Sequence, residues 1–167
     1  MMNKIGNKFI FLSTLFSFSV YGAQYIPLDL EQFQKTGVCV GCDLSEASLS
    51  SHDNANLEQS LLVKVSMEYG HFYTSNFSYA QMMFATLDNA KFSGSKFVFT
   101  DLTGADFHYA NLSSCDFTGA NLAGANLDYA DLVRARISDE QLAQAISLNC
   151  TLLPDGRQHP RNDGKPC

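Results

Sequence analysis

Large apolar side chains recur at every fifth position of this chain, without a break, from residue 57 to residue 137. These positions hold Leu57, Leu62, Met67, Phe72, Phe77, Met82, Leu87, Phe92, Phe97, Leu102, Phe107, Leu112, Phe117, Leu122, Leu127, Leu132 and Ile137. A small or narrow side chain stands two residues before each of them, from Ala55 to Ala135. Residues five apart differ by about 140° in direction on an α-helix and alternate between faces on a flat strand, so neither element fits. The chain must therefore bend once in each repeat, so that every large residue points into one core.

The repeats are most regular over residues 100–134, which read TDLTG ADFHY ANLSS CDFTG ANLAG ANLDY ADLVR. This unit resembles that of the pentapeptide-repeat family, Ala-(Asp/Asn)-Leu-X-X. The resemblance implies an all-β fold, a right-handed quadrilateral β-helix in which four repeats form one square coil and outward Asp and Asn side chains satisfy the turns and stack in ladders. Seventeen repeats give a little over four coils. Residues 60–99 depart from the motif at the Asp/Asn position, which leaves the regularity of their turns open.

The two ends of such a stack need caps, because an apolar coil is otherwise exposed at each end. We assign residues 24–41 to an N-terminal cap, 42–137 to the solenoid, and 138–167 to a C-terminal capping helix and tail. Residues 42–49 look like two further repeats. Three extra residues, 52–54, separate them from the main frame, which predicts a loop or bulge.

Helix-boundary signals support both caps. Asp29 and Gly37 bracket a short N-terminal helix as its start and its stop. Ser138 and Gln141 have the spacing of a capping box, which predicts a helix over 139–148. The segment that follows has no core pattern and is expected to be an irregular tail.

Residues 1–23 have the pattern of a secretory signal peptide, with two lysines followed by an apolar run over residues 9–20. Cleavage is expected after Gly22 or Ala23. The run is too short for the roughly 20 residues that a membrane-spanning helix needs. The sequence therefore predicts a periplasmic or secreted protein, with no transmembrane segment in the mature chain.

The charge of the chain argues against a nucleic-acid partner. Removal of the signal leaves 17 acidic and nine basic side chains, and the repeats over 55–137 contribute only −3 to this balance. Binding of nucleic acid needs clustered Lys and Arg to neutralise phosphates.

Five cysteines in an exported chain suggest disulfide bonds. Cys115 falls at an inward position and is expected to be a buried thiol. Cys39, Cys42, Cys150 and Cys167 allow three pairings, of which we favour Cys150–Cys167, to pin the tail, and Cys39–Cys42 as a local bridge. A thiol oxidoreductase would need a βαβ context around the Cys-X-X-Cys spacing, which the pattern lacks.

No enzyme site is recognisable in the sequence. The Asp and Asn residues are periodic, so their pairing indicates nothing about acid–base catalysis. The four histidines are scattered. We therefore predict no catalytic, cofactor-binding or metal-binding residues.

One feature goes beyond the repeat. Every twentieth residue at the second position after the large one reads Tyr69, Asn89, Tyr109 and Tyr129. Stacked coils would place these side chains in one column, with Tyr79 and Phe99 in a shorter second column. Aromatic side chains in register can bind a glycan or a peptide, although they can also stack for stability alone. Tyr69, Tyr109 and Tyr129 are therefore the candidate binding face.

These observations favour a non-enzymatic binding or structural module of the cell envelope, with an unknown protein or glycan partner and an open oligomeric state. The resemblance raises one alternative, a DNA-mimicking topoisomerase-binding protein. DNA carries one charge per ~1.7 Å, so mimicry over a stack of about 20 Å would need a charge of about −12. A secreted host-directed effector is a further alternative.

Overall fold

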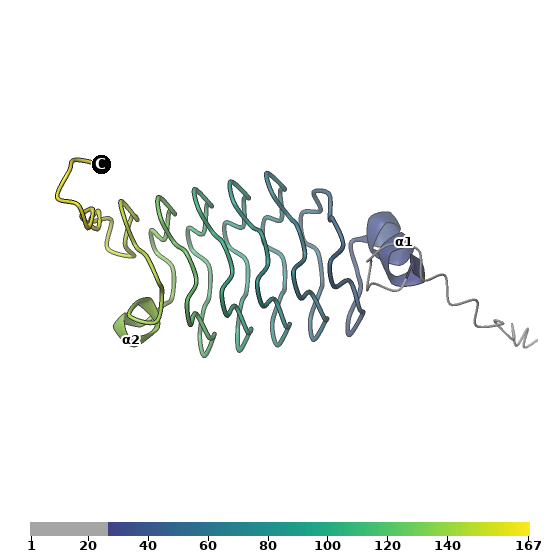
Figure 1. Ribbon diagram of the computed structural model, residues 1–167. Coiled ribbons are helices and arrows are strands. Elements are labelled where there is room, and N and C mark those ends of the chain that lie inside the picture. The colour runs from purple at the N-terminus through teal and green to yellow at the C-terminus, as the bar shows by residue number, and fades with distance from the viewer. Residues whose placement is uncertain (1–26) are drawn as a thin grey trace, which may run out of the picture.

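The computed structural model describes residues 27–167, so the signal-peptide prediction lies outside the described residues. The chain forms a stack of five coils with a helix near each end (Figure 1). Isolated parallel bridges join each coil to the next, as in Asn56↔Asn76 and Asn76↔Lys96, which are 20 residues apart. Within this part of the chain the pairing stays at isolated bridges, because a corner follows every five residues and ends each side of the coil.

The five-residue frame predicted from the sequence is the core of the stack. Every large residue of the frame from Leu57 to Leu132 is fully buried, and the small positions between Ala55 and Ala135 are buried beside them. Phe77, Phe97 and Phe117 stack face to face along the axis, with ring centroids 5.1 Å apart at both steps. Large and small residues alternate around the coil, so the interior is filled without overpacking.

Inward hydroxyl groups bond to the backbone of the preceding coil. Ser95 Oγ donates to the carbonyl of Phe72 at 2.7 Å, and Thr100 Oγ1 donates to that of Phe77 at the same distance. Among the described residues, no buried side-chain nitrogen or oxygen lacks a hydrogen-bond partner. These polar residues therefore substitute for alanine in the core without the cost of an unsatisfied group.

Each corner is a turn in which the residue two after the large one has a positive φ. At one such corner the amide of Ala110 donates to the carbonyl of Phe107, and Tyr109 has φ 58°. The same geometry continues through residues 60–99, where Asn76 alone keeps the Asp or Asn of the motif. The turns there are therefore as regular as those in the rest of the stack.

The outward Asp and Asn side chains brace the turns where they are present. Asp106 Oδ1 accepts from the amide of His108 at 3.0 Å, two residues on, as an Asx turn does. Asn126 Nδ2 donates to Asp106 Oδ1 at 3.0 Å from the next coil. Both roles implied by the family resemblance are present, so these carboxylates have a structural explanation.

The N-terminal cap contains α1 (Pro27–Thr36), which is followed by Gly37, where φ is +68°. Phe33 of this helix is fully buried over the first coil. His52 packs edge-on against Phe33, with centroids 4.9 Å apart.

The expected loop at residues 52–54 is wrong. The first coil is two residues short, because Val38 pairs with Asn56 at a spacing of 18, whereas the pairs from Asn56↔Asn76 to Asp116↔Arg136 are spaced by 20. The amide of His52 donates to the carbonyl of His71, as the amide of the large residue Leu57 donates to that of Asn76. The repeat before His52 is therefore two residues short, and His52 occupies the position of a large apolar residue beneath α1.

The C-terminal cap contains α2 (Asp139–Leu142) with both hydrogen bonds of the predicted capping box. The expected helix over 139–148 is too long, because the chain leaves the helix after Leu142 and Ser147 pairs with Asn126. Residues 147–154 thus return to the coil register. A turn follows at residues 154–156, with Leu152 paired antiparallel to Gln158.

Candidate functional site

Exposed aromatic side chains gather at the corners of the coils. Those with large exposed fractions, between 47% and 68%, are Tyr69, Tyr79, Phe84, Phe99 and Tyr109. All of them have positive φ, between 54° and 61°. Bulky residues are uncommon in this conformation, which favours glycine and asparagine. These aromatics therefore sit where both their backbone and their exposure are unfavourable.

The candidate binding face is only partly assembled. Tyr109 and Tyr129 stack with ring centroids 4.7 Å apart and an angle of 24° between the planes. His108 lies beside them, with its ring centroid 4.3 Å from that of Tyr109. Tyr69 lies two coils from Tyr109, and Asn89 fills the coil between them. The structure thus brings together two of the three tyrosines.

The corner made of residues 68–69, 88–89, 108–109 and 128–129 is here named the tyrosine ridge. Three of its eight residues are acidic and none is Lys or Arg. Because Tyr109 and Tyr129 stack along the axis, each covers one face of the other ring. The ridge therefore presents ring edges and hydroxyl groups at this stacked pair.

Glycines accommodate the aromatics at the other corners. Phe99 lies over Gly119 of the next coil, where an added Cβ would come within 2.4 Å of the ring. Phe84 lies over Gly104 in the same way, at 2.7 Å. Tyr79 and Phe99 stack at 5.5 Å as the second aromatic column. The 20-residue spacing of each Phe–Gly pair is visible in the sequence and would have revealed both contacts.

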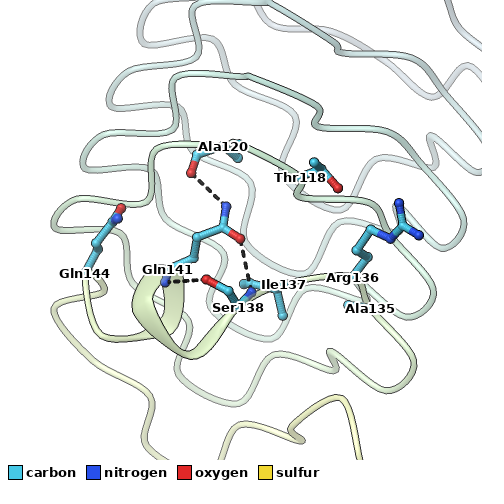
Figure 2. A pocket seen from close by; sticks show the side chains of 9 residues that line it. Thr118, Ala120, Ala135, Arg136, Ile137, Ser138, Gln141 and Gln144 are labelled. Atoms are coloured by element: carbon cyan, nitrogen blue, oxygen red, sulfur yellow. Dashed lines mark hydrogen bonds between the residues drawn. The ribbon is translucent and has the colours of Figure 1, made fainter.

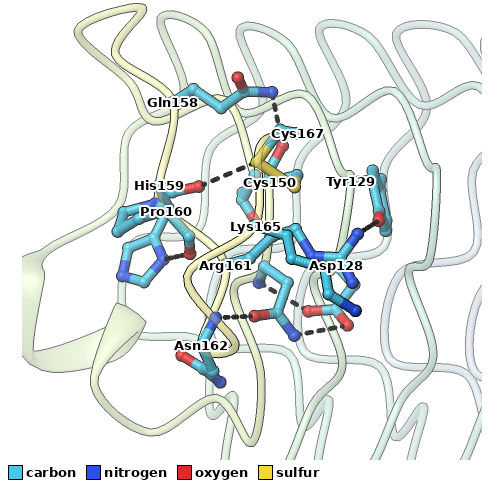
Figure 3. The surroundings of a disulfide bond; sticks show 12 residues. Asp128, Tyr129, Cys150, Gln158, His159, Pro160, Arg161, Asn162, Lys165 and Cys167 are labelled. Atoms are coloured by element: carbon cyan, nitrogen blue, oxygen red, sulfur yellow. Dashed lines mark hydrogen bonds between the residues drawn. A yellow bond between two sulfur atoms is a disulfide. The ribbon is translucent and has the colours of Figure 1, made fainter.

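The C-terminal tail lies against the last step of the tyrosine ridge (Figure 3). Arg161 Nη1 donates to the hydroxyl of Tyr129 at 3.3 Å. The amide of Asn162 donates to Asn149 Oδ1 at 2.8 Å, and Asn149 in turn donates to Asp128. The periodicity gave no signal for this contact, because the tail does not follow the repeat.

The electrostatics of this step favour a charged carboxylate. Burial would raise the pKa of Asp128, but hydrogen bonds from the side chains of Ser147 and Asn149, the amide of Asn149 and the charge of His108 together lower it below its usual range. Asp128 therefore stays ionised beside Arg161. The pKa of Arg161 is raised, mainly by its hydrogen bond to Asp163, and the charges of Tyr129 and Asp128 add to this shift.

A hollow of about 670 Å³ lies between the last coil and α2 (Figure 2). The side chain of Gln141 fills part of this end by donating to the carbonyls of Phe117 and Ala120 at 2.6 and 2.8 Å. Gln144 Oε1 accepts from the amide of Leu122 at 3.0 Å. These amides replace the backbone partners that a further coil would supply, so the hollow is explained as part of the cap.

The cysteines pair as the sequence analysis favoured. Cys39 and Cys42 are bonded in the N-terminal cap, with Cα atoms 5.4 Å apart, and Cys150 is bonded to Cys167 with Cα atoms 5.5 Å apart. Cys115 is buried as a free thiol, and burial raises its pKa to about 12. Asp29 lies close to Cys39 and Cys42, but their disulfide removes the two thiolates that a metal site there would need.

The fold and these corners define a solenoid of five-residue repeats, four to a coil. A family model described as pentapeptide repeats, in eight copies, matches residues 80–119 and 100–139. Residues 80–139 therefore carry the repeats of the pentapeptide-repeat family.

Several solved structures resemble the chain. A pentapeptide repeat protein from the thylakoid lumen of Arabidopsis thaliana is 22% identical, with a TM-score of 0.52 over 67% of this chain and 77% of that one. The plasmid-mediated fluoroquinolone resistance protein QnrB1, treated with trypsin, is 21% identical, with a TM-score of 0.49 over 61% of this chain and 53% of that one. At these identities the likeness concerns the fold alone. No curated protein matches the sequence.

Proposed function

We propose that this chain is a non-enzymatic binding module, exported to the periplasm or secreted, that recognises a partner through the tyrosine ridge of a right-handed quadrilateral β-helix. The exposed, unfavourably placed Tyr69 and Tyr109 carry this proposal, since tyrosine side chains kept in solvent at a strained backbone position are typical of interaction sites. The two disulfide bonds support export, because such bonds persist in oxidising compartments. Among the described residues, neither helix has the length and apolar character to span a membrane.

A protein partner fits the ridge better than a glycan. Sugars bind aromatic rings by stacking on an outward face, whereas Tyr109 and Tyr129 turn their faces toward one another. Ring edges and hydroxyl groups suit side chains and backbone groups of a polypeptide. Tyrosine is also enriched at the centres of protein interfaces.

The alternative of a DNA-mimicking topoisomerase-binding protein is less well supported. The repeats carry a charge of −3, about a quarter of what mimicry over this length would need. A secreted host-directed effector would use the same binding surface and differs only in destination.

Cell fractionation combined with capture tests the proposal. The processed protein is expected in the envelope or the medium, and the purified chain, with its disulfide bonds intact, is expected to retain a protein partner from an envelope extract. A full-length cytoplasmic product would contradict export. Processed wild-type protein that retains no partner in any envelope or extracellular fraction would contradict the binding function.

A further inference from the structure

The tyrosine ridge contains three tyrosines and three acidic side chains. Glu68 precedes Tyr69 and Asp128 precedes Tyr129, and Asp88 lies in a coil between them. Two sides of the solenoid meet at the ridge, and the residues that form the bridges between coils on these sides point outward. Lys91 is the single Lys or Arg among them. The surface thus pairs carboxylates with tyrosine hydroxyl groups, and both accept hydrogen bonds from guanidinium and ammonium ions.

One step of the ridge already holds such a cation. Arg161 reaches it from the tail, 32 residues along the chain from Tyr129, and donates to the tyrosine hydroxyl next to Asp128. The disulfide bond between Cys150 and Cys167 closes the tail over this step (Figure 3). The contact shows how an arginine from a segment outside the repeats binds at this corner. The steps at Tyr109 and Tyr69 are exposed.

We infer that the free steps of the tyrosine ridge, residues 68–69, 88–89 and 108–109, bind a basic, extended polypeptide segment of a partner protein through its arginine or lysine side chains. The inference rests on the proposed binding function and specifies the partner's chemistry. It is based on charge complementarity and on continuity with the observed Arg161 contact.

The spacing of the ridge defines the length of the segment. Coils are separated by about 4.8 Å, so the three free steps span about 10 Å. An extended chain advances about 3.3 Å per residue, so about four residues run the length of the free steps. Side chains on alternate residues point to one face about 6.6 Å apart, and the long side chains of Arg and Lys span the difference from the coil spacing.

The test measures the binding of a fluorescein-labelled hexa-arginine peptide to the mature, oxidised protein by fluorescence anisotropy, with hexa-glutamate as the matched probe. The ridge variant is Tyr69→Asn with Tyr109→Asn, because Asn89 shows that asparagine occupies this corner with φ 58°. The control is Tyr79→Asn with Phe99→Asn at the diagonally opposite corner. A second pair of double variants tests the charges. The ridge variant is Glu68→Gln together with Asp88→Asn, and its control is Glu58→Gln together with Asp101→Asn, which removes the same charge elsewhere.

We expect hexa-arginine, and not hexa-glutamate, to bind. The ridge variants should weaken binding roughly fivefold or more, and the matched controls less than twofold. Arg161→Gln should leave binding unchanged or tighten it, because it frees the last step. Equal loss of binding in ridge and control variants would mean that net charge alone attracts the peptide. Weaker binding by Arg161→Gln would mean that Arg161 does not occupy the surface to which the peptide binds. Either result overturns this inference, whereas wild-type protein that still captures an envelope partner keeps the binding function.

Discussion

Truncation of Phe97 is the most direct test of the packing described here. Phe97 is fully buried and lies in the middle of a stack, with Phe77 and Phe117 each 5.1 Å away. Phe92 and Phe107 meet its edge at 5.4 and 6.0 Å. Its side chain therefore contacts aromatic neighbours in its own coil and in both adjacent coils.

The expected cost of Phe97→Ala follows from two terms. Burying a phenylalanine side chain contributes about 1.5–3 kcal/mol, and the cavity left in a rigid stack adds to the loss. We expect the free energy of unfolding to fall by about 4 kcal/mol, or roughly 12–16 °C in melting temperature for a chain of this size. Phe97→Leu should cost only about 1–2 kcal/mol, because the same column begins with Leu57 and ends with Ile137.

Urea unfolding followed by far-UV circular dichroism and tyrosine fluorescence measures both variants, since the chain has no tryptophan. Tyr69→Asn is the matched exposed control and should change stability by less than about 0.5 kcal/mol. A lower m-value for Phe97→Ala would show that the coils on either side unfold separately, as nearest-neighbour coupling allows. If Phe97→Ala costs no more than Tyr69→Asn, the assignment of the inward frame is wrong.

Three further predictions concern single positions. Gly119→Ala should destabilise the protein by about 1–2 kcal/mol more than Gly124→Ala in thermal melts, because both glycines have φ near +70° but only Gly119 faces a ring. Peptide mapping without reductant should recover Cys150 joined to Cys167, and their replacement by serine should cost about 3 kcal/mol; recovery of both as free thiols would contradict the pairing. Cys115 should resist thiol reagents until the protein unfolds. Its pKa is raised to about 12 in the folded state, so unfolding above about pH 9 releases a proton from this thiol. The free energy of unfolding should therefore fall from about pH 9 toward 12, and Cys115→Ala should remove this part of the fall.

The sequence predicted the coils well because their geometry follows from side-chain volume. A core that admits one large and one small residue per side imposes a period that survives where Gln81 or Lys91 replaces the motif's Asp or Asn. The same period placed Tyr109 over Tyr129 correctly. It did not orient the rings, because that depends on the backbone conformation at the corner.

The ends of the stack were harder to predict. His52, which is half-buried, occupies the position of a large residue because its coil is two residues short, and a fixed frame interprets this as an insertion. The C-terminal helix stops early because Gln141 and Gln144 reach the open edge of the last coil with their side-chain amides. Arg161 lies beyond any repeat. Each of these features depends on one contact between specific groups, which leaves no periodic trace.

The corner aromatics differ in how well stability alone explains them. Phe99 covers Gly119 and stacks on Tyr79, so burial of its ring offsets part of the backbone cost. Tyr109 shares its stack with Tyr129. Tyr69 has the largest exposed fraction of the corner aromatics, 68%, with Asn89 and not a ring in the next coil of its column. Asparagine or glycine would satisfy the same positive φ at lower cost. Packing within the chain therefore leaves Tyr69 unexplained, and the contact with a partner proposed above would account for a tyrosine at this step of the ridge.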